Sequence, residues 1–312
     1  MPTSRRILLA HGLMGFSRIG PTIEYFNQVR GYFDVECTFI QPDVNPAGSI
    51  SGRAQQLLDA IQGQVPAEEL DRGRVVHIVA HSMGGLDARF LISQRGLGKS
   101  AWIASLATLS TPHQGTPIAD LVTGADVLRL PDIASFATLP GQTIANIMQA
   151  LGNPVSLPLL PIPTPMSMFE ALRDLGNYVK NLVGTPPAAF RDLTLAATRD
   201  FNQTHDSLEG IPLLCFAGDS SPNRTMNRAL YATWAILNCR TGMNDGMVPA
   251  SSASGWPGAG DIEVRSVPAD HFEEVGWASA FDGFPPARHY DISELYGAIN
   301  VWQRALAPGQ RG

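Results

Sequence analysis

Residues 75–85 read VVHIVAHSMGG and carry the strongest fold signal in the chain. Its first half is an apolar, β-branched run typical of a buried strand, and residues 86–92 continue with a helix-forming sequence. Ser82 lies at the junction, with Ala80 two positions before it and Gly84 two positions after it. A serine on so sharp a strand-to-helix turn needs small residues at both positions. The stretch therefore predicts a nucleophile elbow whose box, A-H-S-M-G, is a variant of G-x-S-x-G, with Ser82 as nucleophile.

Strand-like and helix-like segments alternate on both sides of this elbow. Apolar runs typical of strands cover residues 6–10, 33–40, 103–109, 213–217 and 262–267. Helical spacing of apolar residues covers residues 52–64, 193–202 and 293–307. Because strands that alternate with helices pair in parallel, we expect an α/β fold with a mainly parallel sheet flanked by helices.

Residues 118–190 differ in texture from the rest of the chain. They are rich in Leu, Ile, Ala, Met and Pro and contain few charges. A disordered linker would be less apolar than this. We therefore expect one domain over residues 1–312, with residues 118–190 inserted as a cap or lid of short helices that include residues 145–151 and 168–182.

Composition restricts the possible partners. The formal net charge is −6 without a basic cluster, which argues against a nucleic-acid partner and against a polybasic membrane anchor. No apolar run is long enough for a transmembrane segment, and the first residues lack the apolar core of a signal peptide. The compartment therefore stays open between the cytoplasm and a mature secreted form.

The three cysteines, Cys37, Cys215 and Cys239, fit no metal spacing. Cys215 and Cys239 could pair, although buried free thiols are the favoured interpretation.

A serine nucleophile needs a histidine to accept its proton and a carboxylate to hold that histidine. His271 comes four residues after the last expected strand, at the edge where catalytic loops belong. His289, the other histidine late enough in the chain, lies in the sequence PPARH and fits a surface loop better. We therefore assign the base to His271.

Three aspartates are candidates for the acid. Asp245 lies in GMNDGMVP, where glycines permit a tight turn, and Asp219 directly follows the strand at residues 213–217. Asp270 is adjacent to His271, and neighbouring side chains rarely face one another. Asp245 is favoured over Asp219, and Asp270 is expected to point away.

Acyl transfer also requires hydrogen-bond donors for the oxyanion of the tetrahedral intermediate. The backbone N–H of Met83, directly after the elbow serine, is one candidate. The N–H of Leu13, in the loop after the first strand, is the other. His11 is expected to brace that loop and His81 to orient the elbow, while His113 fits a structural role or a substrate contact equally well.

Seven motifs occur in an order that resembles the bacterial true lipases of the Pseudomonas–Burkholderia–Proteus type. They are HGLMGF (11–16), GRAQQL (52–57), the elbow, TPHQG (111–115), FN (201–202), NDGMV (244–248) and DHFEEV (270–275). The resemblance implies an α/β-hydrolase fold, a Ser82–His271–Asp245 triad, Leu13 and Met83 as oxyanion donors, and a mobile lid. It also implies triacylglycerol hydrolysis through an acyl-serine at a lipid–water interface.

The chain departs from that family in three respects. An alanine such as Ala80 in the elbow is more familiar from small Bacillus lipases and some polyhydroxyalkanoate depolymerases. The family's calcium site uses a carboxylate two residues after the histidine, a glutamine six after it and an upstream aspartate. Here the first two positions hold Glu273 and Trp277, and residues 223–240 contain no aspartate. Because these positions do not match the calcium ligands, we expect neither a metal nor another cofactor. The disulfide of secreted members also has no counterpart after Asp245.

The sequence therefore favours a carboxylic ester hydrolase, most simply a lipase. The alternatives within enzymes are a polyester depolymerase and a short-chain carboxylesterase, which would use the same five residues. The alternative from another class is a hydrolase-like protein that binds an apolar ligand without catalysis.

Overall fold

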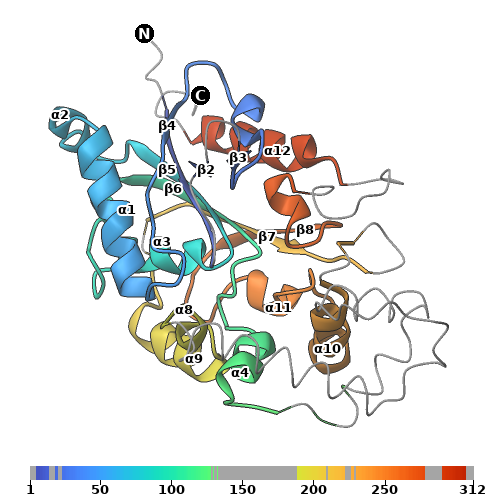
Figure 1. Ribbon diagram of the computed structural model, residues 1–312. Coiled ribbons are helices and arrows are strands. Elements are labelled where there is room, and N and C mark those ends of the chain that lie inside the picture. The colour runs from blue at the N-terminus through green and yellow to red at the C-terminus, as the bar shows by residue number, and fades with distance from the viewer. Residues whose placement is uncertain are drawn as a thin grey trace.

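Six parallel strands form the central sheet of the computed structural model, in the order β4-β1-β5-β6-β7-β8 (Figure 1). Their bounds are β1 Arg6–Ala10, β4 Thr38–Ile40, β5 Val76–His81, β6 Ile103–Leu109, β7 Leu213–Gly218 and β8 Ile262–Val267. Two short strands, β2 (Arg18–Ile19) and β3 (Ile23–Glu24), pair with each other. The structure describes residues 5–13, 18–19, 23–127, 129, 132, 188–208, 210–221, 226–227, 230–277 and 290–306.

Helices cover both faces of the sheet (Figure 1). The α-helices are α1 Ile50–Gln64, α2 Ala67–Leu70, α3 Gly84–Ile92, α4 Pro117–Thr123, α8 Ala188–Asp192, α9 Leu195–Thr204, α10 Tyr231–Thr241, α11 Ala250–Ala253 and α12 Ile292–Ala305. Short 3-10 helices lie at η1 Val29–Tyr32, η2 Ser100–Trp102 and η5 Glu273–Val275. No helix among the described residues is both long enough and apolar enough to span a membrane.

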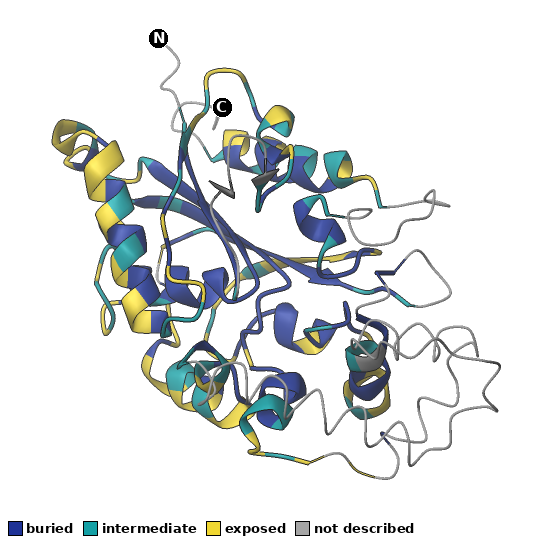
Figure 2. Ribbon diagram, viewed as in Figure 1, coloured by how far each residue is buried: buried dark blue, intermediate teal, exposed yellow. Residues whose placement is uncertain are grey.

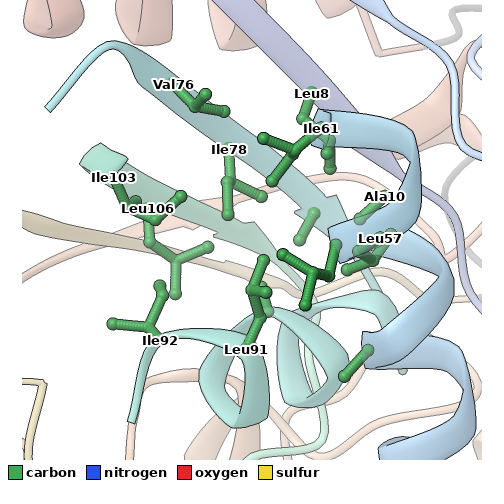
Figure 3. Close-up of a cluster of buried hydrophobic side chains, with 14 of the residues drawn as sticks. Leu8, Ala10, Leu57, Ile61, Val76, Ile78, Leu91, Ile92, Ile103 and Leu106 are labelled. Carbon is green, nitrogen blue, oxygen red and sulfur yellow. The ribbon is translucent and has the colours of Figure 1, made fainter. Parts of the chain in front are cut away.

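The core has two layers because side chains alternate across each strand. On one face of β1, Leu8 and Ala10 pack with Ile78 of β5 and with Leu57 of α1, as Figure 3 shows. On the other face, Ile7 and Leu9 belong to a second cluster formed with α12 and η1. Figure 2 shows the result, in which the strands are mostly buried and the outer surface of α1 is exposed. The sheet thereby fixes the strand ends from which the functional loops leave.

The predicted strands at residues 6–10, 103–109 and 262–267 are confirmed without change of bounds. The strand expected at residues 33–40 is wrong in its first part, because β4 begins at Thr38. Edge strand β4 pairs only with β1, and Thr38 lies opposite Arg6, the first residue of β1. Within the described part of the chain, no strand lies beside the segment that precedes Thr38.

The helix expected from residue 52 begins at Ile50 instead. Ser49 precedes it as N-cap, and its hydroxyl accepts the backbone N–H of Gly52. A serine cap satisfies one of the unpaired N–H groups of a first helical turn, so the cap sets the start of α1.

Of the expected cap at residues 118–190, the structure describes residues 118–127, 129, 132 and 188–190. They include most of α4 and the start of α8, which contact each other. The helices expected at residues 145–151 and 168–182 lie outside the described residues. In Figure 1, α4, α8, α9, α10 and α11 gather on one side of the sheet.

Candidate active site

Ser82 lies on a strained turn between β5 and α3. Its φ of 54° is in the left-handed region, which non-glycine residues rarely adopt. The turn is held because Ser82 N–H donates to the Leu109 carbonyl at 2.9 Å, while its own carbonyl accepts the Gly85 N–H at 3.1 Å. A side chain at Gly84 would clash with the Ala10 carbonyl, which explains the small residue after the serine. Backbone strain that the surroundings sustain is typical of functional positions.

His271 and Asp245 form a buried pair. His271 Nδ1 lies 2.6 Å from Asp245 Oδ2, and the His271 backbone N–H donates to the Asp245 carbonyl at 3.0 Å. The other carboxylate oxygen, Oδ1, accepts the N–H groups of Met247 and Val248 at 2.8 and 2.7 Å. Asp245 is therefore fixed on both oxygens, and its position in turn fixes the imidazole.

The other candidate residues lie elsewhere. Asp219 donates its backbone N–H to Val267 and is only half-buried. Asp270 directs its carboxylate to the N–H groups of Asn227, Phe272 and Glu273, away from His271. His289 lies outside the described residues. The structure thus brings together His271 and Asp245, the residues favoured in the sequence.

The loop after β1 lies directly against Ser82. A Cβ added to Gly12 would be 2.6 Å from the Ser82 Cβ, so only glycine permits this approach. His11 Nδ1 donates to the Gly12 carbonyl at 3.0 Å. In a trans peptide the carbonyl and the following N–H point in opposite directions, so this bond orients the N–H of Leu13.

A buried ion pair supports the same loop, and sequence analysis did not identify it. Arg53 of α1 donates to Asp87 of α3 at 2.8 Å, and both side chains are fully buried. The same guanidinium donates to the His11 carbonyl at 2.6 Å. Through these bonds, helices α1 and α3 fix the position of the loop relative to the elbow.

Ser82 and His271 open onto one cavity of about 530 Å³. Its wall is almost entirely apolar. It includes Leu13, Ile118, Ala119, Phe190, Leu193, Met247, Val248, Phe272, Val275 and Trp277. Concave apolar sites with a few convergent polar groups are typical of small-molecule binding. The arrangement suits an apolar molecule whose reactive group reaches Ser82.

A second polar network lies beneath the candidate triad, and the sequence did not indicate it. Tyr25 Oη lies 2.7 Å from His81 Nδ1, and His81 Nε2 lies 3.5 Å from Glu274 Oε2. Ser110 Oγ donates to the other Glu274 oxygen at 2.7 Å. Burial raises the pKa of Glu274 well above its usual value and lowers the pKa of His81 well below its own. Both effects favour the uncharged forms of Glu274 and His81.

The surroundings of His113 favour a structural role over a substrate contact. It is fully buried and contacts the Thr108 hydroxyl at 3.1 Å and Arg89 at 3.5 Å, and it does not line the cavity. The cysteines are free thiols, but only Cys215 is buried, whereas Cys37 is half-buried and Cys239 is exposed. The expectation of buried thiols is therefore correct for Cys215 alone.

The residues at the positions of the family's calcium site do not fit calcium. Glu273 accepts the Asp270 N–H while Asp270 accepts the Glu273 N–H, a reciprocal cap that uses both side chains within the loop. The Trp277 side chain offers no oxygen, and its indole N–H donates to the Tyr25 carbonyl at 2.8 Å. Calcium requires six to eight oxygen ligands. Within the described part of the chain, Glu273 belongs to no cluster of potential metal ligands.

We therefore expect activity and melting temperature to be unchanged by excess EDTA, because protein hydrogen bonds hold the His271 loop. The measurement is ester hydrolysis and thermal unfolding with and without chelator. A loss that added calcium restores would contradict this expectation.

Comparison with known sequences gives partial matches. The family described as a PGAP1-like alpha/beta domain matches residues 47–127, which include the elbow. Triacylglycerol lipase 2 of Saccharomyces cerevisiae is 40% identical over 102 residues, which cover 32% of this chain and 31% of that protein. A triacylglycerol lipase of Burkholderia plantarii is 24% identical over 84% of this chain and 63% of its own length. The matched regions thus span less than two thirds of these two relatives.

Solved structures define the fold. The Staphylococcus hyicus lipase superposes with a TM-score of 0.64 at 14% identity, covering 100% of this chain and 98% of that one. EstA from Clostridium botulinum gives a TM-score of 0.58 at 17% identity, covering 96% and 87%. The predicted α/β-hydrolase fold, with its parallel sheet flanked by helices, is confirmed.

Proposed function

We propose that this protein is a serine ester hydrolase of the lipase type. The observation that carries the proposal is that Ser82 and His271 open onto the same apolar cavity, with Asp245 buried behind the imidazole. The relatives named triacylglycerol lipase, at 24–40% identity, support the same activity.

Acylation begins when Ser82 Oγ attacks the ester carbonyl. His271 Nε2 accepts the hydroxyl proton, and the buried carboxylate of Asp245 stabilises the imidazolium that forms. The N–H groups of Leu13 and Met83 stabilise the negative oxygen of the tetrahedral intermediate. His271 then returns its proton to the leaving alcohol, and the acyl group stays on Ser82.

Deacylation repeats these steps with water as nucleophile. His271 accepts a proton from water, the hydroxide attacks the acyl carbonyl, and the carboxylic acid leaves as Ser82 regains its proton. No cofactor takes part in this scheme.

The first experiment separates an enzyme from a protein that only binds apolar ligands. A fluorophosphonate should react with Ser82, forming an Oγ–P bond as fluoride leaves, and intact-mass analysis measures the adduct. The control is the Ser82→Ala variant, which should not react. A wild-type protein that stays unlabelled while folded would contradict the proposal.

The proposed substrate is an ester with an apolar acyl chain, triacylglycerols included. Short-chain carboxylesters and polyesters are the alternative substrates for the same residues. Rates measured on a chain-length series of triacylglycerols and aryl esters, and on a polyhydroxyalkanoate, distinguish the three. Preference for short aryl esters or for the polymer would contradict the lipase assignment, but the protein would still be an ester hydrolase.

We further propose that residues 118–190 act as a lid over the site. Both ends of this segment reach the cavity wall, through Ile118 and Ala119 at one end and Phe190 at the other. Opening would expose apolar side chains, which costs about 25 cal/mol per Å² in water and much less at an oil surface. From the sequence we expect Leu159, Leu160, Met166 and Phe169 to be among the side chains exposed on opening, and all four lie outside the described residues.

The lid proposal predicts a rise in rate when substrate forms an emulsion, because the interface binds the open form better than the closed one. The measurement is hydrolysis of a short triacylglycerol across its solubility limit. A smooth saturating curve through that limit would indicate a rigid cap that only shapes the pocket.

A further inference from the structure

A second, small cavity lies behind the loop that carries Leu13. Its volume is about 20 Å³, and it is lined by residues of β1, the β3–η1 region and the segment after β4. His11, Glu24, Arg30 and Gln41 supply its polar groups. A space of this size holds about one water molecule, provided that polar partners surround it.

Buried polar atoms without hydrogen-bond partners border this cavity. Within the described part of the chain, they are His11 Nε2 and the Nε and Nη2 atoms of Arg30. His11 as a whole is only 2% exposed. Arg30 Nε lies 3.5 Å from the Glu24 carboxylate, beyond a good hydrogen bond. A buried polar atom without a hydrogen-bond partner is unfavourable, so these atoms favour a ligand that can bond to them.

Their chemistry is complementary. His11 Nδ1 carries a proton, because its partner is the Gly12 carbonyl, which can only accept. Burial lowers the pKa of His11 to about 4, so the ring is neutral near pH 7 and Nε2 is an acceptor. The two free guanidinium nitrogens of Arg30 are donors. A molecule that accepts from Arg30 and donates to His11 satisfies both sides, and water does this.

We propose that one buried water bridges Arg30 and His11 Nε2, and that Arg30 is thereby a positioning residue for the oxyanion hole. The inference rests on the proposed function. The water, by donating to Nε2, acts together with the Gly12 carbonyl to keep His11 in the tautomer with the proton on Nδ1. That proton holds the Gly12 carbonyl, and the Gly12–Leu13 peptide then directs the Leu13 N–H towards the oxyanion.

A crystal structure of the whole chain tests the site directly. We expect an ordered water within hydrogen-bond distance of both His11 Nε2 and an Arg30 nitrogen. A dry cavity, or one filled by a side chain, would overturn the proposal whether or not the protein hydrolyses esters.

Substitution tests the positioning role. Arg30→Met keeps an unbranched apolar side chain but removes the donors, together with the guanidinium that lies 5.3 Å from the centre of the Phe39 ring. We expect kcat to fall about tenfold with KM unchanged, since outright loss of an oxyanion donor costs about 10²–10³-fold. Arg30→Lys, which can still donate to the water, should retain most of the activity. Arg265→Met is the matched control, because the Arg265 guanidinium is exposed and pairs with Glu263.

A spectroscopic readout separates positioning from general damage. Nitrogen-15 NMR of the imidazole should find His11 protonated on Nδ1 in the wild type and in Arg30→Lys. In Arg30→Met it should find a mixture of tautomers. An Arg30→Met variant with unchanged kcat and unchanged His11 tautomer would disprove the role of Arg30. A wild type that hydrolyses no ester but holds the water would instead disprove only the proposed function.

Discussion

Ser82→Ala and His271→Ala are each expected to lower kcat for ester hydrolysis by about 10⁵–10⁶-fold, because nucleophile and base act as one unit. Without the hydroxyl no acyl-serine forms, and without the imidazole the hydroxyl keeps its proton. The double variant should be no worse than either single one, since the second change removes nothing that still works. KM should change little, because the apolar cavity wall stays intact.

The measurement is initial rate on a soluble aryl ester, together with thermal unfolding to show that each variant folds. Ser251→Ala is the matched control, because Ser251 is exposed on α11. Near-normal hydrolysis by folded Ser82→Ala would place the nucleophile elsewhere.

Asp245→Asn is expected to lower kcat by about 10³–10⁴-fold, as loss of the acid does when the geometry is kept. The structure gives the reason. Oδ1 accepts two backbone N–H groups, so an asparagine must leave its oxygen there and turn its NH₂ towards His271 Nδ1. Two donors then face each other unless the imidazole moves its proton to Nε2. In that tautomer Nε2 cannot accept the proton of Ser82.

Asp219→Asn is the control for this substitution, because Asp219 also follows β7 and is only half-buried. It should leave kcat within about twofold, the range of ordinary surface changes. If Asp219→Asn lowered kcat by this much and Asp245→Asn left kcat unchanged, the acid would be Asp219. Melting temperatures of both variants separate lost catalysis from lost folding.

Elements that depend on neighbouring residues could be predicted from the sequence alone. The elbow requires small residues beside the serine, and Ala80, Gly84 and a buried strand meet that requirement within eleven residues. Short apolar runs identified β1, β6 and β8 with their observed bounds. The acid loop could be chosen because its glycines and its Asp245 are neighbours in the chain. Local steric requirements restrict which residue types can occupy neighbouring positions, and these predictions were based on such restrictions.

Contacts between residues far apart in the chain could be identified only from the tertiary structure. Ser110 and Glu274 are 164 positions apart and form a buried hydrogen bond, and Tyr25 and Trp277, which are 252 positions apart, form a partly buried one. Strand β4 begins opposite the first residue of β1. The sequence of residues 33–40 does not contain this information, because it depends on where β1 begins. The cavity behind His11 exists because β1, η1 and the segment after β4 meet there. Burial makes each unpaired polar atom costly, and burial is a property of the packed chain, so these networks appear only once the sheet and its helices are assembled.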